Sequence, residues 1–141
     1  MARPTPAERK RPLPGDGFVP DAVGEVMHAV TIAASSASVW LWLVQMGAGR
    51  AGWYSYDWVD NGGIPSATTI IAKHQHLAVG DVMPSLPGAK TSFIVTAIEP
   101  FRDLVLTAPS PNGGALVSWE FFLDPSGAGT ETRLLVRGRI G

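Results

Sequence analysis

Acid–base side chains gather in one short, glycine-rich stretch of the sequence. Asp57 or Asp60 could serve there as a general base. Tyr54 or Tyr56 could donate a proton to an enolising carbonyl, with Arg50 as an electrostatic partner. Cyclisation or dehydration of a carbonyl compound needs such transfers, and an apolar pocket would raise the carboxyl pKa towards the useful range. The alternative is that both carboxylates cap turns or pair with Arg50 at the surface, where carboxylates usually lie.

The same stretch, residues 45–61, is also dense in aromatic side chains, namely Trp53, Tyr54, Tyr56 and Trp58. On a short helix neither face would be purely apolar, because Asp57 and Asp60 would share a face with Trp53 and Tyr56. A buried core helix normally has one clean apolar face, so the mixture favours the wall of a partly polar ligand pocket. The alternative is that these aromatics are packing residues of the core.

Metal and nucleotide sites are not expected. His74 and His76 would share one side of a strand, but zinc needs a third or fourth ligand and His28 is distant in the sequence. The glycines around residues 47–49 follow a predicted helix, whereas a nucleotide-binding loop joins a strand to a helix. The sequence also lacks a Gly-x-Ser-x-Gly elbow. We therefore predict no metal and no cofactor.

Composition bounds the class of protein. The chain has 141 residues, 45% of them hydrophobic, and a net charge of −1, which is enough for one domain with a real core. Scattered Lys and Arg argue against a nucleic-acid surface, and the absence of cysteine excludes disulfides, thiolate metal sites and thiol catalysis. The longest apolar run, residues 39–44, is far too short for a membrane span, and the basic start resembles no signal peptide. A soluble cytoplasmic protein is predicted.

The elements that would position these side chains follow from the pattern. Residues 1–20 are rich in Pro, Gly and charge, and are predicted to be an extended, flexible, solvated arm before a single domain at 21–141. Alternation predicts a strand over 25–33. Ser35 or Ser36 then caps a helix whose apolar positions are Val39, Trp40, Leu43 and Val44.

The second half is strongly β. A short strand ends at Pro84, and four runs at 91–99, 104–107, 115–123 and 131–140 are separated by turn clusters, which predicts an antiparallel meander. Alternation in the third run places Trp119 and Phe121 on the face towards the helices. In the last run, Arg133, Arg137 and Arg139 alternate with apolar residues and are expected to line the solvent side.

Four motifs carry a family resemblance: Ala-Ser-Val-Trp-Leu-Trp-Leu-Val-Gln-Met-Gly, Gly-Arg-Ala-Gly-Trp-Tyr-Ser-Tyr-Asp-Trp, Leu-Ala-Val-Gly-Asp and Val-Ser-Trp-Glu-Phe. With the order of elements, they make residues 13–141 resemble bacterial members of the START-like (SRPBCC) superfamily, often labelled polyketide cyclase/dehydrase-like. The resemblance implies an α+β helix-grip fold. In that fold a curved antiparallel β-sheet wraps a long C-terminal helix, with two short N-terminal helices at one end and a hydrophobic cavity between.

Members of this superfamily bind lipids, sterols, polyketides or plant hormones, and a minority catalyse cyclisation or dehydration. The superfamily has no universal catalytic residue, so the resemblance transfers none. By position it implies ligand-binding residues on the second short helix and on the sheet: Trp53, Tyr54, Tyr56, Trp58, Phe93, Trp119 and Phe121.

One departure from the family is the C-terminus. The family's long last helix is missing, since the sequence stops at Gly141 directly after the last predicted strand. An uncovered sheet face would need protection. A truncation, cover by a partner or second copy, and cover by the N-terminal arm would each account for this, and a homodimer is favoured because apolar surface must be buried somewhere.

The sequence thus predicts binding of a small hydrophobic molecule, such as a lipid, a polyketide or another apolar metabolite. The first alternative is a polyketide cyclase- or dehydratase-like enzyme that uses Asp57, Asp60, Tyr56 and Arg50. The second is a protein-interaction or assembly domain that uses the uncovered sheet face. Neither nucleic acid nor a membrane span is expected.

Overall fold

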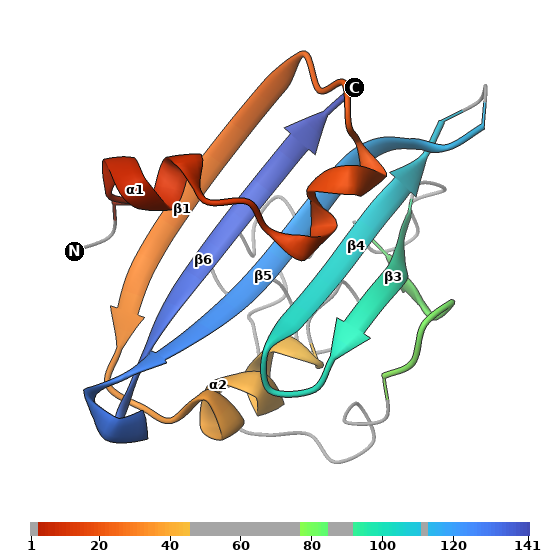
Figure 1. Ribbon diagram of the computed structural model, residues 1–141. Helices are drawn as coiled ribbons and strands as arrows, with labels where there is room; N and C mark the ends of the chain where they lie inside the picture. The colour runs from red at the N-terminus through yellow and green to blue at the C-terminus, as the bar shows by residue number, and fades with distance from the viewer. Residues whose placement is uncertain (1–2, 46–76, 85–91, 111–112) are drawn as a thin grey trace, which may run out of the picture.

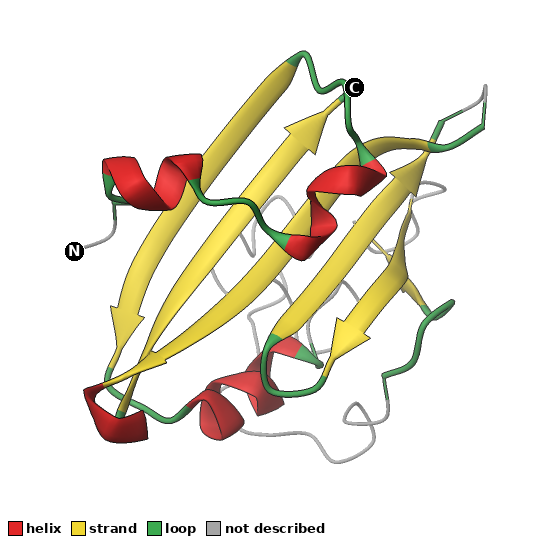
Figure 2. Cartoon of the chain, viewed as in Figure 1, coloured by secondary structure: helices red, strands yellow, loops and turns green. Residues whose placement is uncertain are grey.

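The computed structural model describes residues 3–45, 77–84, 92–110 and 113–141. A short helix and a 3-10 helix come first, followed by a strand, a second helix and a run of strands (Figures 1 and 2). The elements are α1 (Pro6–Lys10), η1 (Pro14–Phe18), β1 (Gly24–Ile32), α2 (Ser36–Leu43), β2 (Val82–Pro84), β3 (Ser92–Glu99), β4 (Asp103–Pro109), β5 (Ala115–Ser126), η3 (Gly127–Gly129) and β6 (Glu131–Ile140).

The strands form one six-stranded antiparallel sheet in the order β1-β6-β5-β4-β3-β2. From β2 to β6 each strand pairs with the next along the chain, and β1 closes the far edge beside β6. The predicted meander is therefore confirmed. Short links favour this arrangement because antiparallel neighbours can be joined by tight turns.

Alternation along the strands gives the sheet two distinct faces. We call them the α2 face, which carries Trp119, Phe121 and Leu123 of β5, and the arm face, which carries Glu120 and Phe122. Trp119 and Phe121 pack against the core cluster that contains α2, as the sequence predicts. Because the period of a strand is two, the register decides which chemistry each face presents.

Helix α2 forms and docks as its sequence indicates. The Ser35 hydroxyl accepts the backbone N–H of Ser38 at 3.2 Å, which caps the first turn. Val39, Trp40, Leu43 and Val44 are buried against sheet residues that include Val95, Leu104, Leu106 and Leu123. This helix therefore covers the β3–β5 part of the α2 face.

The N-terminal arm, residues 3–20, corrects one expectation. It is neither extended nor fully solvated, because it forms α1 and η1 and runs across the arm face in front of β6 and β5 (Figure 1). A capping box starts α1: Thr5 Oγ1 accepts from Glu8 N at 3.1 Å, and Glu8 Oε1 accepts from Thr5 N at 2.8 Å. Leu13 and Val19 are buried, so the arm contributes to the core. The domain boundary at residue 20 stays a prediction.

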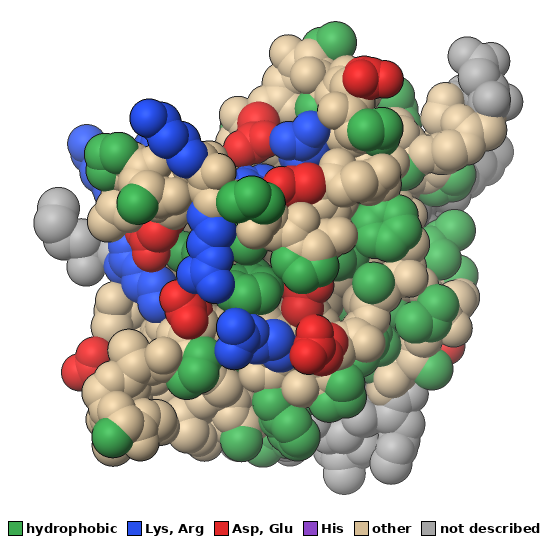
Figure 3. Space-filling view, in the orientation of Figure 1, with side chains coloured by type: hydrophobic (Ala, Val, Ile, Leu, Met, Phe, Trp, Pro, Cys, Tyr) green, Lys and Arg blue, Asp and Glu red, His purple; other side chains and the backbone are tan. Residues whose placement is uncertain are grey.

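The arginines of β6 correct a second expectation. They lie on the face opposite Trp119, as alternation requires, but the arm covers that face and Arg137 is only 2% exposed. Figure 3 shows Lys, Arg, Asp and Glu side chains interleaved along the arm on this face. The Arg133 guanidinium bonds both carboxylate oxygens of Glu8 at 3.0 Å and holds the pKa of Glu8 down to about 2. These guanidinium groups therefore anchor the arm.

No helix in the described ranges has both the length and the apolarity that a bilayer crossing requires.

Candidate ligand-binding site

The α2 face is built almost wholly from apolar side chains. On β5, β6 and β1 the register brings together Val117, Trp119, Phe121, Leu123, Leu134, Val136, Ile140, Val26, Val30 and Ile32. His28 is the ionisable side chain that β1 adds to this face, and it is exposed. A ligand that rests here meets hydrocarbon and indole surface, with little opportunity for ion pairing.

Burial across this face is uneven. Over β3 and β4 the side chains of Val95, Leu104 and Leu106 are fully buried beneath α2. Towards β1 and the end of β6 the cover is thinner, and Val26 and Ile140 are 43% and 44% exposed. Accessible apolar side chains that adjoin a buried cluster are typical of binding surfaces. We call this part the open wall and define it by Val26, Val30, Trp119, Val136 and Ile140.

Trp119 and Gly138 give the open wall its shape. Gly138 of β6 lies between Trp119 of β5 and Val26 of β1 as the cross-strand partner of both. A Cβ atom at Gly138 would stand 2.9 Å from the Trp119 ring and 3.0 Å from Val26 Cγ2. The indole therefore lies against the strand where glycine leaves room, and presents a half-buried aromatic surface.

Replacing Gly138 by valine is expected to lift the indole from the sheet. Overpacking of this kind typically costs about 1–3 kcal/mol of unfolding free energy, and the tryptophan emission should shift to longer wavelength as the ring meets water. Gly24→Val is the matched control, because a Cβ at Gly24 meets Ile140 only at 4.0 Å. Urea unfolding followed by fluorescence would test this, and a Gly138→Val midpoint equal to that of wild type would contradict it.

A shallow depression adjoins α2 near the end of β1. Its volume is about 180 Å³, and it is lined by Ile32, Ala34, Ser38, Val39 and Trp42. Pockets for small molecules usually enclose about 300–1,000 Å³. The described residues therefore supply walls of a site, with Ser38 the one side chain of this lining that carries a hydroxyl.

The predicted site residues divide into two groups. Phe93, Trp119 and Phe121 come from β3 and β5, and the structure brings them together around one cluster on the α2 face. The others lie outside the described residues, so their roles stay predictions: Arg50, Trp53, Tyr54, Tyr56, Asp57, Trp58, Asp60, His74 and His76.

Sequence reasoning missed a second ionisable cluster, on the arm face. Asp103 of β4, Glu120 of β5 and Arg137 of β6 are all buried. Charged residues that alternate with apolar ones on a strand normally indicate a solvated face. A signal was present in β5, where Phe122 follows Glu120 on the same face and implies that something covers both. Within the described ranges, no group of three or more metal-ligating side chains comes together.

The two carboxyl groups of this cluster have higher pKa values than exposed carboxyl groups. Glu120 accepts the Gly15 N–H at 3.0 Å and 3.1 Å through its two oxygens. Burial and the neighbouring Asp103 carboxyl raise the pKa of Glu120 to about 9, and burial raises the pKa of Asp103. The two acids therefore retain a shared proton at neutral pH.

Comparison with solved structures shows which proteins have a similar fold. No protein-family model matches the sequence, and a search of curated proteins found no match. Among solved structures, the Aha1 dimer from Colwellia psychrerythraea superposes with a TM-score of 0.51 at 15% identity, over 82% of this chain and 75% of that one. The protein MLL2253 from Mesorhizobium loti superposes with a TM-score of 0.50 at 18% identity, over 84% and 77%. A polyketide-cyclase-like protein from Corynebacterium glutamicum reaches 0.47 at 16% identity, over 87% and 68%.

At such identities the likeness is one of fold. The chain has an α+β helix-grip fold, with a curved antiparallel sheet and short N-terminal helices. The expectation drawn from the sequence motifs is confirmed at that level.

Proposed function

We propose that the protein binds a small apolar molecule against the open wall of its α2 face. The observation that carries this proposal is the half-buried Trp119 indole, which lies across Gly138 beside exposed Val26 and Ile140. Burying apolar surface stabilises a complex by about 25 cal/mol per Å². A contiguous wall of this kind therefore favours an apolar ligand over a charged one.

The ligand's contact with this wall is expected to be hydrocarbon or ring surface. The five side chains that define the open wall are apolar, and His28 is the ionisable side chain that β1 places beside them, so a charged ligand group buried there would lose hydration with little compensation. Any polar end of the ligand would point away from this part of the sheet. The enzyme alternative depends on Arg50, Tyr56, Asp57 and Asp60, and it stays a prediction.

Trp119→Ala tests the proposal directly. The probe is 1-anilinonaphthalene-8-sulfonate, titrated into the folded protein and followed by its own emission. Removing a large aromatic contact is expected to raise the Kd of the probe about tenfold or more, which corresponds to about 1.4 kcal/mol. Native mass spectrometry before and after mild organic extraction would show whether an apolar compound accompanies the purified protein.

Leu116→Ala is the matched control. Leu116 is an exposed apolar residue of the same strand, β5, but alternation places it on the opposite face from Trp119. Its removal should leave the Kd of the probe within about twofold of wild type, since surface changes away from a site have small effects. Equal Kd values for wild type and Trp119→Ala would remove the open wall from consideration.

A further inference from the structure

Two carboxyl groups lie together beneath η1. Asp103 of β4 and Glu120 of β5 are 4% and 2% exposed. Glu120 is opposite Val105 and Asp103 is opposite Phe122, so the two acids are diagonal neighbours on the arm face. Asp103 Oδ1 is buried without a hydrogen-bond partner. Two carboxylates so close and so buried cannot both be ionised without a large cost.

Gly15 of η1 is the direct cover of this pair. Its N–H donates to both oxygens of Glu120, and the residue is buried. A Cβ atom at Gly15 would stand 2.7 Å from Glu120 Oε1 and 2.9 Å from Val105 Cγ2. The backbone of η1 therefore contacts Glu120 of the pair without any intervening side chain, so the protonation state of the pair acts on η1 through Glu120.

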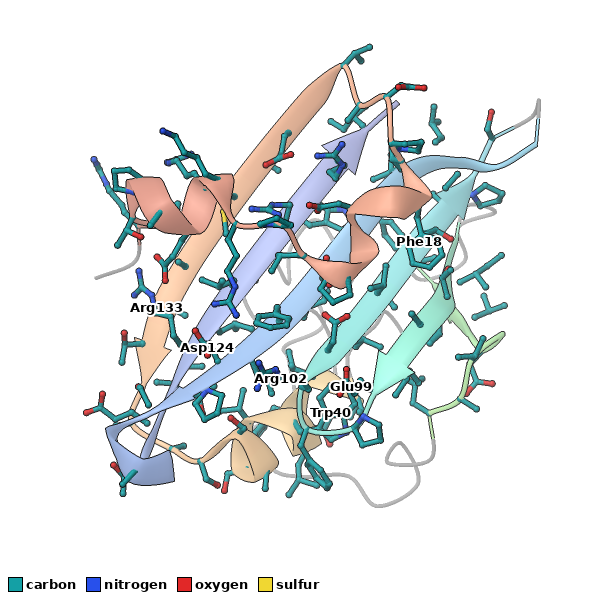
Figure 4. All side chains as sticks on the ribbon, in the orientation of Figure 1. Phe18, Trp40, Glu99, Arg102, Asp124 and Arg133 are labelled. Carbon is teal, nitrogen blue, oxygen red and sulfur yellow. The ribbon has the colours of Figure 1, made fainter. Side chains whose placement is uncertain are left out.

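The charged groups around the pair offer it little compensation. Asp16 of η1 adds a further negative charge beside Glu120, and Glu99 of β3 does the same beside Asp103. Arg102, in the β3–β4 turn next to Glu99 (Figure 4), opposes this effect at Asp103. Arg137 is the cross-strand partner of Glu120, but its terminal nitrogens donate to Asp16, to backbone carbonyls of the arm and to Met27 Sδ, and its Nε lies 3.3 Å from Glu25 Oε1.

We propose that η1 is a proton-held latch: it stays on the sheet while Asp103 and Glu120 share a proton, and residues 13–19 lift when that proton is lost. Lifting lets water reach both carboxylates and removes the cost of their burial. It also exposes Leu13 and Val19, which are buried in the closed arm. Helix α1 stays in place because Arg133 bonds its Glu8 carboxylate independently of the pair, whereas lifting residues 13–19 also breaks the bonds between Arg137 and Asp16.

The direction of the pH dependence follows from the pKa values. With η1 closed, the pKa of Glu120 is about 9, against an ordinary value of 4.5. The closed state therefore binds the proton more tightly than the open state. Its advantage is complete below pH 4.5, falls as the pH rises from 4.5 to about 9, and is lost above that. Acidification does not open the latch.

Hydrogen exchange of the full-length protein, measured by mass spectrometry at pH 6, 7.5 and 9, tests the latch. After correction for intrinsic exchange rates, the protection of amides in residues 13–19 should fall by up to about tenfold per pH unit. Glu120→Gln mimics the protonated acid, since its amide can accept from Gly15 and donate to Asp103. Its protection should change much less with pH than that of wild type, since Asp103 is then the only acid left of the pair. Gly15→Ala should lose protection at every pH because of the contact with Glu120.

Two further variants keep the test decisive. Glu131→Gln makes the same substitution at an exposed carboxylate at the start of β6, away from the pair, and should keep the wild-type slope. Asp103→Asn removes the second acid and should give a shallower slope even if Glu120→Gln folds poorly. A flat profile in wild type, an equal slope in Glu120→Gln, or an equal loss of protection throughout β5 and β6 would each overturn the latch.

Discussion

Arg137→Ala is expected to lower the free energy of unfolding by about 3–5 kcal/mol, the usual cost of removing one partner from a buried ionic network. The Arg137 guanidinium donates to the carbonyls of Glu8, Arg9 and Arg11 at 3.1, 3.2 and 2.7 Å. It also bonds Asp16 through both carboxylate oxygens, at 3.1 and 3.2 Å. Its loss removes a donor from each of these acceptors and removes the positive charge at the end of α1.

The measurement is urea unfolding at pH 7 together with hydrogen exchange across residues 3–20. The arm should lose protection before the sheet does, because the sheet keeps its own core. Arg9→Ala is the matched control: Arg9 is an exposed arginine of the same arm, and its truncation should change stability by no more than about 0.5 kcal/mol. Wild-type stability and a protected arm in Arg137→Ala would show that Arg137 does not anchor the arm.

Trp40→Ala is also expected to lower the free energy of unfolding by about 3–5 kcal/mol. Trp40 is buried in the cluster that fixes α2 to β3, β4 and β5. Its ring also lies 6.4 Å, between centroids, from that of Phe101, at an interplanar angle of 59°. The cavity left by the indole would loosen α2 from the α2 face. Probe binding at the open wall should therefore weaken together with stability.

Leu41→Ala provides the comparison for Trp40→Ala within the same helix. Leu41 is 40% exposed, so its truncation removes much less buried surface and should cost under about 1 kcal/mol. Urea midpoints and the Kd of the fluorescent probe would be measured for both variants. Equal midpoints for the two variants would mean that Trp40 is not the residue that fixes α2 to the sheet.

The local sequence pattern predicted an element correctly wherever one side of that element packs against the core. Ser35 and the apolar spacing of Val39, Trp40 and Leu43 predicted α2, and alternation in β5 predicted that Trp119 and Phe121 lie towards it. The motif resemblance supplied the helix-grip fold. Within the candidate site, Trp119 and Phe121 were assigned to the correct face of β5, because successive residues of a strand alternate between two faces.

The local sequence pattern did not predict the structure of the N-terminal arm. Residues 1–20 are rich in Pro and charge, and such segments seldom bury enough surface to order alone. This arm is ordered because β6 supplies arginines for it and β5 supplies Glu120. These partners lie more than 100 residues away in the chain, as in the Glu8–Arg133 and Gly15–Glu120 contacts. The Thr5–Glu8 capping box was a local signal of α1 that composition concealed.

The sequence by itself determined the strands and α2, the alternation of faces in β1 and β5, and the class of fold, because these depend on periodicity and on the chemistry of near neighbours. The tertiary structure alone decided that Asp103 and Glu120 share a buried site, that Gly138 makes room for Trp119, and that Arg137 lies beneath the arm. Each of these depends on which strands are neighbours and on what covers them. Proton affinity and packing are set by that three-dimensional environment, which residue type does not reveal.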